Sequence, residues 1–243
     1  MLTKAIRDCG RPMGAIVEAG MPKEEALALI AATPRAADLV AQVSCRKRWV
    51  TRTPGHRFHV VAIDCGIKYS IIRHLSERGC NVTIVPFNTA ARDILAFNPD
   101  GIIFSNGPAG GPEVPSLSAL FAELKGQKPI LGIGLGQEII GLHYGARLEK
   151  MGCGIHGDHP IRDLESGRIS IAVLNQSWCF PSVEGTALTP THVTVPEGYV
   201  VGFEQPGDRV FGIQFQLESA PGPQDNVYLF DRFIQMMEDP CHA

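Results

Sequence analysis

The fold of this chain is decided by the stretch Lys128-Pro-Ile-Leu-Gly-Ile-Gly-Leu-Gly-Gln-Glu-Ile-Ile-Gly-Leu142. It opens with an apolar run, residues 129–133, that has the length of a strand. Glycines stand at alternate positions 132, 134 and 136, from the end of this run onward, and residues 137–144 then carry apolar side chains at helical spacing. This order predicts a strand, a tight glycine turn and a helix. α/β enzymes expose a nucleophile at such a turn, where N–H groups of the helix N-terminus can hold an oxyanion.

The apex of this turn is expected at Gly134, which has no side chain and therefore cannot be a nucleophile. Two interpretations stay open. Glycine could simply relieve the strain of a turn that needs unusual backbone angles, in a pocket without activity. Alternatively, the loss of a side chain could make room for a larger ligand.

The composition describes an ordinary globular protein of one large domain, or one domain with a small appendage. The chain has 243 residues, of which 44% are apolar and 19% charged. A net charge of −3 gives no electrostatic footprint for nucleic acid or for a membrane surface. The N-terminus lacks the apolar core of a signal peptide. The seven cysteines include no CxxC pair, which favours reduced thiols and a cytoplasmic location.

From residue 56 onward, predicted strands alternate with predicted helices. Such alternation is typical of a doubly wound, mostly parallel α/β sheet, with the ligand crevice at the carboxyl ends of the strands. The strands are expected at residues 58–63, 81–86, 101–105 and 129–133, and the helices at 68–78, 90–97, 117–124 and 137–144.

After Gly145 the pattern changes to an expected antiparallel β extension and a final helix. Residues 151–160 are rich in glycine and are expected to form a loop. Residues 1–50 are expected as a short α-leaning segment with helices at 2–9, 23–30 and 38–44, and residues 51–243 as the main domain. The later strands are expected at residues 168–174, 191–195, 199–203 and 210–215, and the last helix at 226–237.

Several stretches together resemble one family. In order and spacing, they are similar to the class I glutamine amidotransferase (glutaminase) domain of the carbamoyl-phosphate synthetase small subunit. The resemblance implies a flavodoxin-like doubly wound sheet with an antiparallel β extension. It also implies that residues 1–50 are a remnant of that subunit's N-terminal domain. The resembling stretches are residues 60–68, 98–108, 132–136, 159–163, 220–223 and 229–234.

The same resemblance implies where the catalytic residues of the family would stand. Members use a cysteine at the elbow with a late His and Glu, and pass ammonia to a synthetase partner. Here the cysteine position is Gly134 and the histidine position is Gln216, so only Glu218 is retained. The chain is therefore expected to be a divergent member that cannot hydrolyse glutamine by this mechanism. No cofactor is expected.

The pocket segments of the family are also altered in this chain. A glutamine of the elbow helix is replaced by Glu138, and Gln176 stands where the family has histidine. Glu138 and Glu218 could do acid–base work, bind an amine or a cation, or be remnants. The candidate ligand-binding residues are Gly107, Gly134, Leu135, Glu138, His159, Asn175, Gln176, Gln216 and Glu218.

Other chemistry-bearing residues have simpler interpretations beside the sharper ones. Cys153, His156 and His159 would suit zinc by ligand type, but a structural loop is favoured, so no metal is expected. Cys179 could be a replacement nucleophile. Asp64 and Lys68 are expected to form a structural charge pair at the first strand-to-helix turn.

Two functions remain open from the sequence. The first is a pseudo-amidotransferase that acts as a binding or partner subunit, with a synthetase-type large subunit or a homodimer partner. The second is a repurposed enzyme that uses the crevice for a different small molecule bearing an amine or amide. In both, a small polar molecule is expected in the elbow crevice. A pocket plugged by Phe215, Trp178 or Leu217 would favour the first function.

Overall fold

The computed structural model describes residues 4, 13–34, 37–109 and 114–238. The chain divides into two compact units, Met1–Ala37 and Asp38–Ala243. In the first unit, helix α2 (Lys23–Ala32) confirms the helix expected at 23–30. The helix expected at 2–9 lies almost wholly outside the described residues. No described helix is long and apolar enough to cross a membrane.

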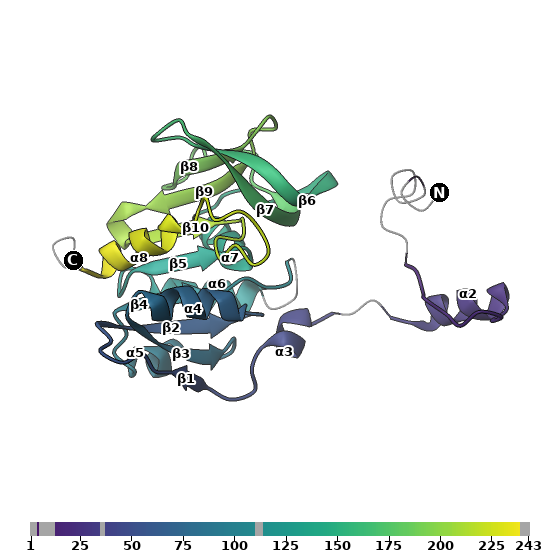
Figure 1. Ribbon diagram of the computed structural model, residues 1–243, viewed down its shortest axis with the longest axis horizontal. Coiled ribbons are helices and arrows are strands. Elements are labelled where there is room, and N and C mark those ends of the chain that lie inside the picture. Colours follow the sequence, from purple (N-terminus) through teal and green to yellow (C-terminus); the bar gives the residue numbers. More distant parts are fainter. Residues whose placement is uncertain (1–3, 5–12, 35–36, 110–113, 239–243) are drawn as a thin grey trace. The chain divides into compact units, whose positions relative to one another are not determined.

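The second unit is built on one mixed sheet (Figure 1). Its described strands lie in the order β1-β3-β2-β4-β5-β10-β9-β8-β6-β7. The pairs β3–β2, β2–β4, β4–β5 and β5–β10 are parallel, and the remaining pairs are antiparallel. The strands are β1 (Trp49–Thr51), β2 (Phe58–Asp64), β3 (Cys80–Pro86), β4 (Gly101–Phe104), β5 (Ile130–Ile133), β6 (Glu149–Asp163), β7 (Ile169–Cys179), β8 (Thr189–Thr194), β9 (Val200–Gln205) and β10 (Val210–Ile213).

The parallel core has the strand order of a flavodoxin-like sheet. Counted along the chain, β2, β3, β4, β5 and β10 are the first to fifth parallel strands, and they lie in the order 2-1-3-4-5. The direction of winding reverses between β2 and β4. Ligands of doubly wound sheets bind at the carboxyl ends of the strands near this reversal. The expected fold class is therefore confirmed.

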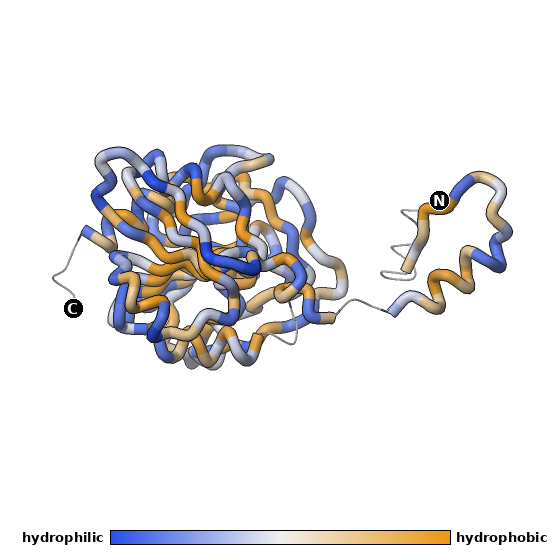
Figure 2. Tube along the Cα trace, turned by 90° about the horizontal axis from the view of Figure 1, so that it is seen from below, coloured by the Kyte–Doolittle hydropathy of each residue, from blue (hydrophilic) through white to orange (hydrophobic). Residues whose placement is uncertain are grey.

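Helices cover both faces of the sheet, and each face has its own apolar core. Helices α5 (Ala91–Leu95), α6 (Val114–Leu124) and α7 (Leu135–His143) pack with Phe104 and Phe121 in one cluster. Helices α4 (Tyr69–Glu77) and α8 (Tyr228–Glu238) pack with Phe211 and Phe230 in the other. Figure 2 shows the apolar segments gathered in the interior strands. The two faces fix α7 and α4 beside the strand ends that carry the candidate site.

Close packing of β5 against α7 explains the glycine spacing of the turn between them. A Cβ at Gly136 would lie 2.2 Å from the backbone oxygen of Phe104. At Gly132 it would lie 2.4 Å from Ile140 Cδ1. Both distances are shorter than real Cβ contacts, so only glycine lets the helix approach the sheet this closely.

The antiparallel extension corrects one expectation. Residues 151–160 do not form a loop, because β6 runs unbroken from Glu149 to Asp163. Because glycine is depleted in strands, the sequence pattern did not predict β6 as a strand. The strand is held by its backbone ladder to β7, with Ile155 opposite Gln176 and Arg162 opposite Ile169. A register shift between Lys150 and Ile155 takes up the irregular part. The extension therefore begins with a strand at residue 149, before the first extension strand expected at residues 168–174.

The beginning of the second unit also differs from the expected residue ranges. Helix α3 (Leu39–Val43) lies within the unit Asp38–Ala243. Strand β1, which was not expected, pairs antiparallel with β3. The boundary expected between residues 50 and 51 falls inside this strand, whereas the compact units divide between Ala37 and Asp38.

Candidate functional site

The candidate site lies where the carboxyl ends of the parallel strands meet. Cys65 follows β2, Asn106 and Gly107 follow β4, Gly134 follows β5, and Gln214 follows β10. The Gly134 N–H donates to the backbone oxygen of Ile213, so the turn is tied to β10. At Gly107, a Cβ would lie 2.2 Å from the Cys65 oxygen, and this glycine lets two strand-end loops touch.

Gly134 stands at the apex of the turn, as the sequence predicts. It precedes the first residue of α7 and has φ 56° and ψ −109°, a backbone conformation that L side chains rarely adopt. A Cβ built there would be 3.5 Å from Asn106 Cβ, which is an ordinary contact. The position therefore has space for a side chain, and its backbone is strained for one.

Lys68 contacts both polar side chains of the late segment, Gln216 and Glu218. Its Nζ donates to Gln216 Oε1 at 2.9 Å and to Glu218 Oε1 at 2.7 Å. Glu218 is 2% exposed. The expected pair of Lys68 with Asp64 is wrong, because Asp64 accepts the backbone N–H groups of Cys45, Gly66 and Ile67. Asp64 shapes the turn, and Lys68 is free to reach the late segment.

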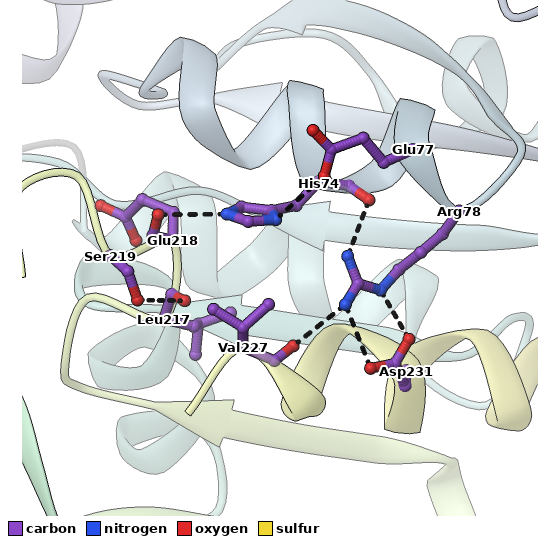
Figure 3. A network of polar contacts seen from close by, with 8 residues as sticks. All are labelled: His74, Glu77, Arg78, Leu217, Glu218, Ser219, Val227 and Asp231. Carbon is purple, nitrogen blue, oxygen red and sulfur yellow. Dashed lines mark hydrogen bonds and ion pairs between the residues drawn. The ribbon is translucent and has the colours of Figure 1, made fainter. Parts of the chain in front are cut away.

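A polar network fixes the backbone next to Glu218 (Figure 3). His74 Nε2, on α4, lies 3.2 Å from the backbone oxygen of Glu218, and its ring stacks on Phe230. Arg78 donates to the carbonyl of His74 and binds both carboxylate oxygens of Asp231 on α8, at 2.7 and 3.0 Å. His74 thus fixes the backbone of Glu218 against α4, which the Arg78–Asp231 ion pair links to α8, while Lys68 binds the Glu218 carboxylate.

Glu138 is buried in the first turn of α7. It is 2% exposed, and its Oε1 accepts from Gln214 Nε2 at 3.5 Å, the outer limit of a hydrogen bond. Burial raises the pKa of Glu138 to about 7, against the weaker opposing effect of Gln214. Since the neutral and charged forms are both populated near pH 7, this carboxyl can donate or accept a proton there.

Buried polar atoms without a partner in the described chain are concentrated around the elbow. Burying such an atom unpaired typically costs ~1–3 kcal/mol, so a group of them points to a ligand or to ordered water. Phe215 and Leu217 are fully buried core residues, while Trp178 is half-buried. Apart from Thr51 Oγ1 and His74 Nδ1, the unpartnered atoms of the described residues are Asn106 Oδ1, both amide atoms of Gln137, Glu138 Oε2, both amide atoms of Gln176, Gln214 Oε1 and Glu218 Oε2.

Strands β6 and β7 pair as an antiparallel ribbon that carries several candidate residues, some of them buried and others exposed. Asn175 is exposed, and its Oδ1 lies 2.6 Å from His156 Nδ1. Gln176, the next residue, is 4% exposed. His159 Nε2 instead lies 3.0 Å from Glu197 Oε2, and Cys153 is exposed. Across the described ranges, no group of three or more His, Cys, Asp and Glu side chains could hold a metal ion.

Sequence reasoning missed two residues that complete the site. Lys68 follows the first parallel strand, and Gln214 follows the last one directly. Because carboxyl ends of parallel strands share one edge, their chain positions were a usable signal. Leu135, by contrast, was expected at the site, and its side chain is 2% exposed. As the first residue of α7, it contributes a backbone N–H that has no acceptor within the helix.

The comparison with known families agrees with this geometry. Residues 61–236 match the family Glutamine amidotransferase class-I. The chain belongs to the class I glutamine amidotransferases. The matched residues include both the glycine turn between β5 and α7 and the segment after β10.

Relatives of the amidotransferase chain come from carbamoyl-phosphate synthases. It is 37% identical to the carbamoyl phosphate synthase small chain of Listeria innocua over 249 residues, which is all of this chain and 68% of that protein. It is 34% identical to the pyrimidine-specific small chain of Bacillus subtilis, over 98% of this chain and 65% of that protein. The chain thus spans about two thirds of the length of these relatives.

Solved structures of the amidotransferase fold match more distantly. One from Thermoplasma acidophilum, described as a GMP synthase protein, has a TM-score of 0.63 at 21% identity and covers 75% of this chain and 95% of its own. A glutamine amidotransferase from Thermotoga maritima has a TM-score of 0.56 at 17% identity and covers 67% of this chain and 77% of its own. These likenesses concern the fold.

Proposed function

We propose that this chain is a pseudo-amidotransferase, a carbamoyl-phosphate-synthase small-chain-like domain that does not hydrolyse glutamine by the Cys–His–Glu mechanism. It acts as a binding or partner subunit, and the partner is a synthetase-type large subunit. The observation that carries the proposal is that glycine stands at position 134 of the elbow and glutamine at position 216 of the late segment, so neither residue can serve as a nucleophile or a base. The names of the relatives support the kind of partner.

The contacts at the late segment support the loss of base chemistry. A glutamine amide has no group that titrates at ordinary pH. Gln216 Oε1 is also bound to the Lys68 ammonium, which keeps the side chain oriented toward Glu218. Glu218, which would orient a histidine ring in the family mechanism, binds a lysine instead. Its carboxylate has a structural partner without any catalytic histidine.

The experiment is an assay of glutamate release from glutamine, with and without the large chain of a carbamoyl-phosphate synthase. We expect no turnover above background in either case, together with formation of a complex in a sedimentation experiment. Ordinary amidotransferase turnover, in the range of about 1–10³ s⁻¹, would overturn the loss of activity. Absence of a complex at micromolar concentrations would overturn the partner role and leave the alternative below.

The alternative is a repurposed site that binds, or acts on, a different small molecule. It is supported by the buried unpartnered oxygens of Glu138 and Glu218 and by the amide of Gln176. The N-terminus of α7 favours a carbonyl or anionic oxygen at the elbow. Glu138 adds an acceptor for an ammonium or amide N–H. The ligand class is therefore a small polar molecule with an oxygen at one end and an amine or amide nearby.

Glu138→Gln tests this alternative through binding. Losing one charge-assisted hydrogen bond costs ~1.5–3 kcal/mol, which corresponds to roughly ten- to a hundredfold weaker binding. The measurement is calorimetric titration of both proteins with an amine- or amide-bearing compound found in a thermal-shift screen. The exposed Glu184→Gln serves as the matched control and should bind like the parent. Equal affinities for all three proteins would refute a role of Glu138 in binding.

A further inference from the structure

A cavity lies away from the elbow, lined by residues of β8, β9, helix α8 and the end of β6. These elements are labelled in Figure 1. The volume of the cavity is about 660 Å³, within the range of small-molecule sites. None of its lining residues belongs to the elbow site. Its walls carry hydroxyls, carboxylates and one guanidinium, and the residues used below are Asp163, Glu165, Thr191, His192, Tyr228 and Arg232.

A chain of hydrogen bonds crosses one wall of this cavity. Thr191 Oγ1 lies 3.0 Å from His192 Nδ1, and His192 Nε2 lies 3.2 Å from the Tyr228 hydroxyl. The hydroxyl donates to Asp163 Oδ2 at 3.3 Å. His192 is 2% exposed, and burial lowers its pKa to about 4, so the ring is neutral at pH 7. The chain therefore consists of neutral groups that end on one carboxylate.

The neutral state of the His192 ring determines which group donates in each hydrogen bond of this chain. Because the single hydroxyl proton of Tyr228 is donated to Asp163, the phenol oxygen must accept the hydrogen bond from His192 Nε2–H. Nδ1 is then the acceptor, and Thr191 donates to it. This leaves the lone pairs of the Thr191 oxygen available to accept from a molecule in the cavity. The wall thus presents acceptors, and a matching ligand must donate.

The side chains that line the cavity carry a net negative charge. Glu204 is paired with Arg232, and Asp231 with Arg78. Asp163 accepts instead from neutral donors, namely the Tyr228 hydroxyl and the N–H groups of Glu165 and Ser166. Although burial opposes it, these backbone N–H groups hold the pKa of Asp163 below its ordinary value. Asp163 and Glu165 therefore bring negative charge that the ion pairs do not offset.

We propose that this cavity is a second binding site, which takes a small primary amine in its ammonium form beside Asp163, Glu165 and the hydroxyl of Thr191. The ammonium supplies the donors and the positive charge that these groups lack. The apolar remainder of the amine lies against Leu164 and Pro190 of the same cavity. The proposal does not depend on what binds at the elbow.

The test is titration of the full chain with n-butylammonium chloride at constant ionic strength, followed by the ¹⁵N signals of the His192 ring. We expect saturable shifts of these signals, with the Nε2–H tautomer in the free protein. n-Butanol, which has the same chain length without the charge, should not produce them. Absence of saturation, or equal shifts with n-butanol, would overturn the proposal.

Asp163→Asn is the decisive variant, because asparagine keeps the shape and the Oδ1 acceptor but removes the charge. Its amide would donate to Tyr228, which would then donate to His192 and switch the ring to the Nδ1–H tautomer. We expect this switch, which shows that the wall is intact, and n-butylammonium binding weakened about ten- to a hundredfold. Glu123→Gln, on the exposed side of α6, should bind the amine like the parent. An unchanged affinity in Asp163→Asn would refute the site.

Discussion

Replacing Gly134 by cysteine should leave glutamine hydrolysis at background. A thiol fits the space, because a Cβ there lies 3.5 Å from its nearest neighbour, although φ of 56° makes the residue strained. The thiol would still lack a base, since Gln216 cannot take its proton. Its pKa would stay near the ordinary ~8.5. Nucleophile and base act as a unit, and losing either can cost roughly 10⁴- to 10⁶-fold in rate.

The informative comparison is with the double variant Gly134→Cys and Gln216→His. A histidine there would have Glu218 beside it, so we expect glutamate release at least about tenfold above the single variant. Full activity should not return, because Glu138 and Gln176 still stand where the resemblance implies other residues. Adding Glu218→Gln to the double variant should remove the gain. A single Gly134→Cys variant as active as the double would show that another base serves the elbow.

Glu138→Gln should make the unliganded domain more stable at pH 8 and leave it unchanged at pH 4. The pKa of Glu138 is raised from 4.5 to about 7 by burial, so folding favours its neutral form. That contribution is fully present below about pH 4.5 and is lost as pH rises through about 7. At ~1.4 kcal/mol per pH unit, the loss is on the order of 3 kcal/mol above pH 7. A glutamine at this position carries no charge at any of these pH values, so the variant does not lose this stability as the pH rises.

Denaturant unfolding at a series of pH values measures this effect. The free energy of unfolding of the parent should fall between about pH 4.5 and 7 relative to that of Glu138→Gln, and the difference should level off at higher pH. Glu184→Gln, at an exposed position, should follow the parent throughout. Parallel curves for the parent and Glu138→Gln would mean that Glu138 titrates as an ordinary exposed acid.

The parallel core could be predicted from sequence because its signals are local. The apolar run before Gly134, the glycine spacing and the helical pattern after it each depend on neighbours within one element. Strand β6 could not be recognised in the same way. Its residues include several glycines, and its stability comes from backbone pairing with β7, which is a contact between segments.

The candidate site was predictable in its positions more than in its contacts. Gly134, Gln216 and Glu218 were located because they stand at fixed places in recognisable stretches. The partner of Lys68 was not, because 148 and 150 residues separate it from Gln216 and Glu218. The burial of Glu138 also depends on how several strand ends close together. No periodic pattern in one segment carries that information.

The β6–β7 ribbon gives the elbow site a wall with its own dynamics. Among the described strands of the ribbon, β8 pairs with Ile161–Asp163 of β6 alone. The half of the ribbon that holds Asn175 and Gln176 is therefore joined to the rest of the sheet by the single bridges Val173–Gln216 and Phe180–Val200. Segments with few neighbours open locally at a lower free energy than the sheet core. We therefore expect the amide hydrogens of this half to exchange with solvent through local opening, before global unfolding. We also expect solvent to reach the buried side chain of Gln176 through this opening, at a lower free energy than opening of the glycine turn and α7 requires.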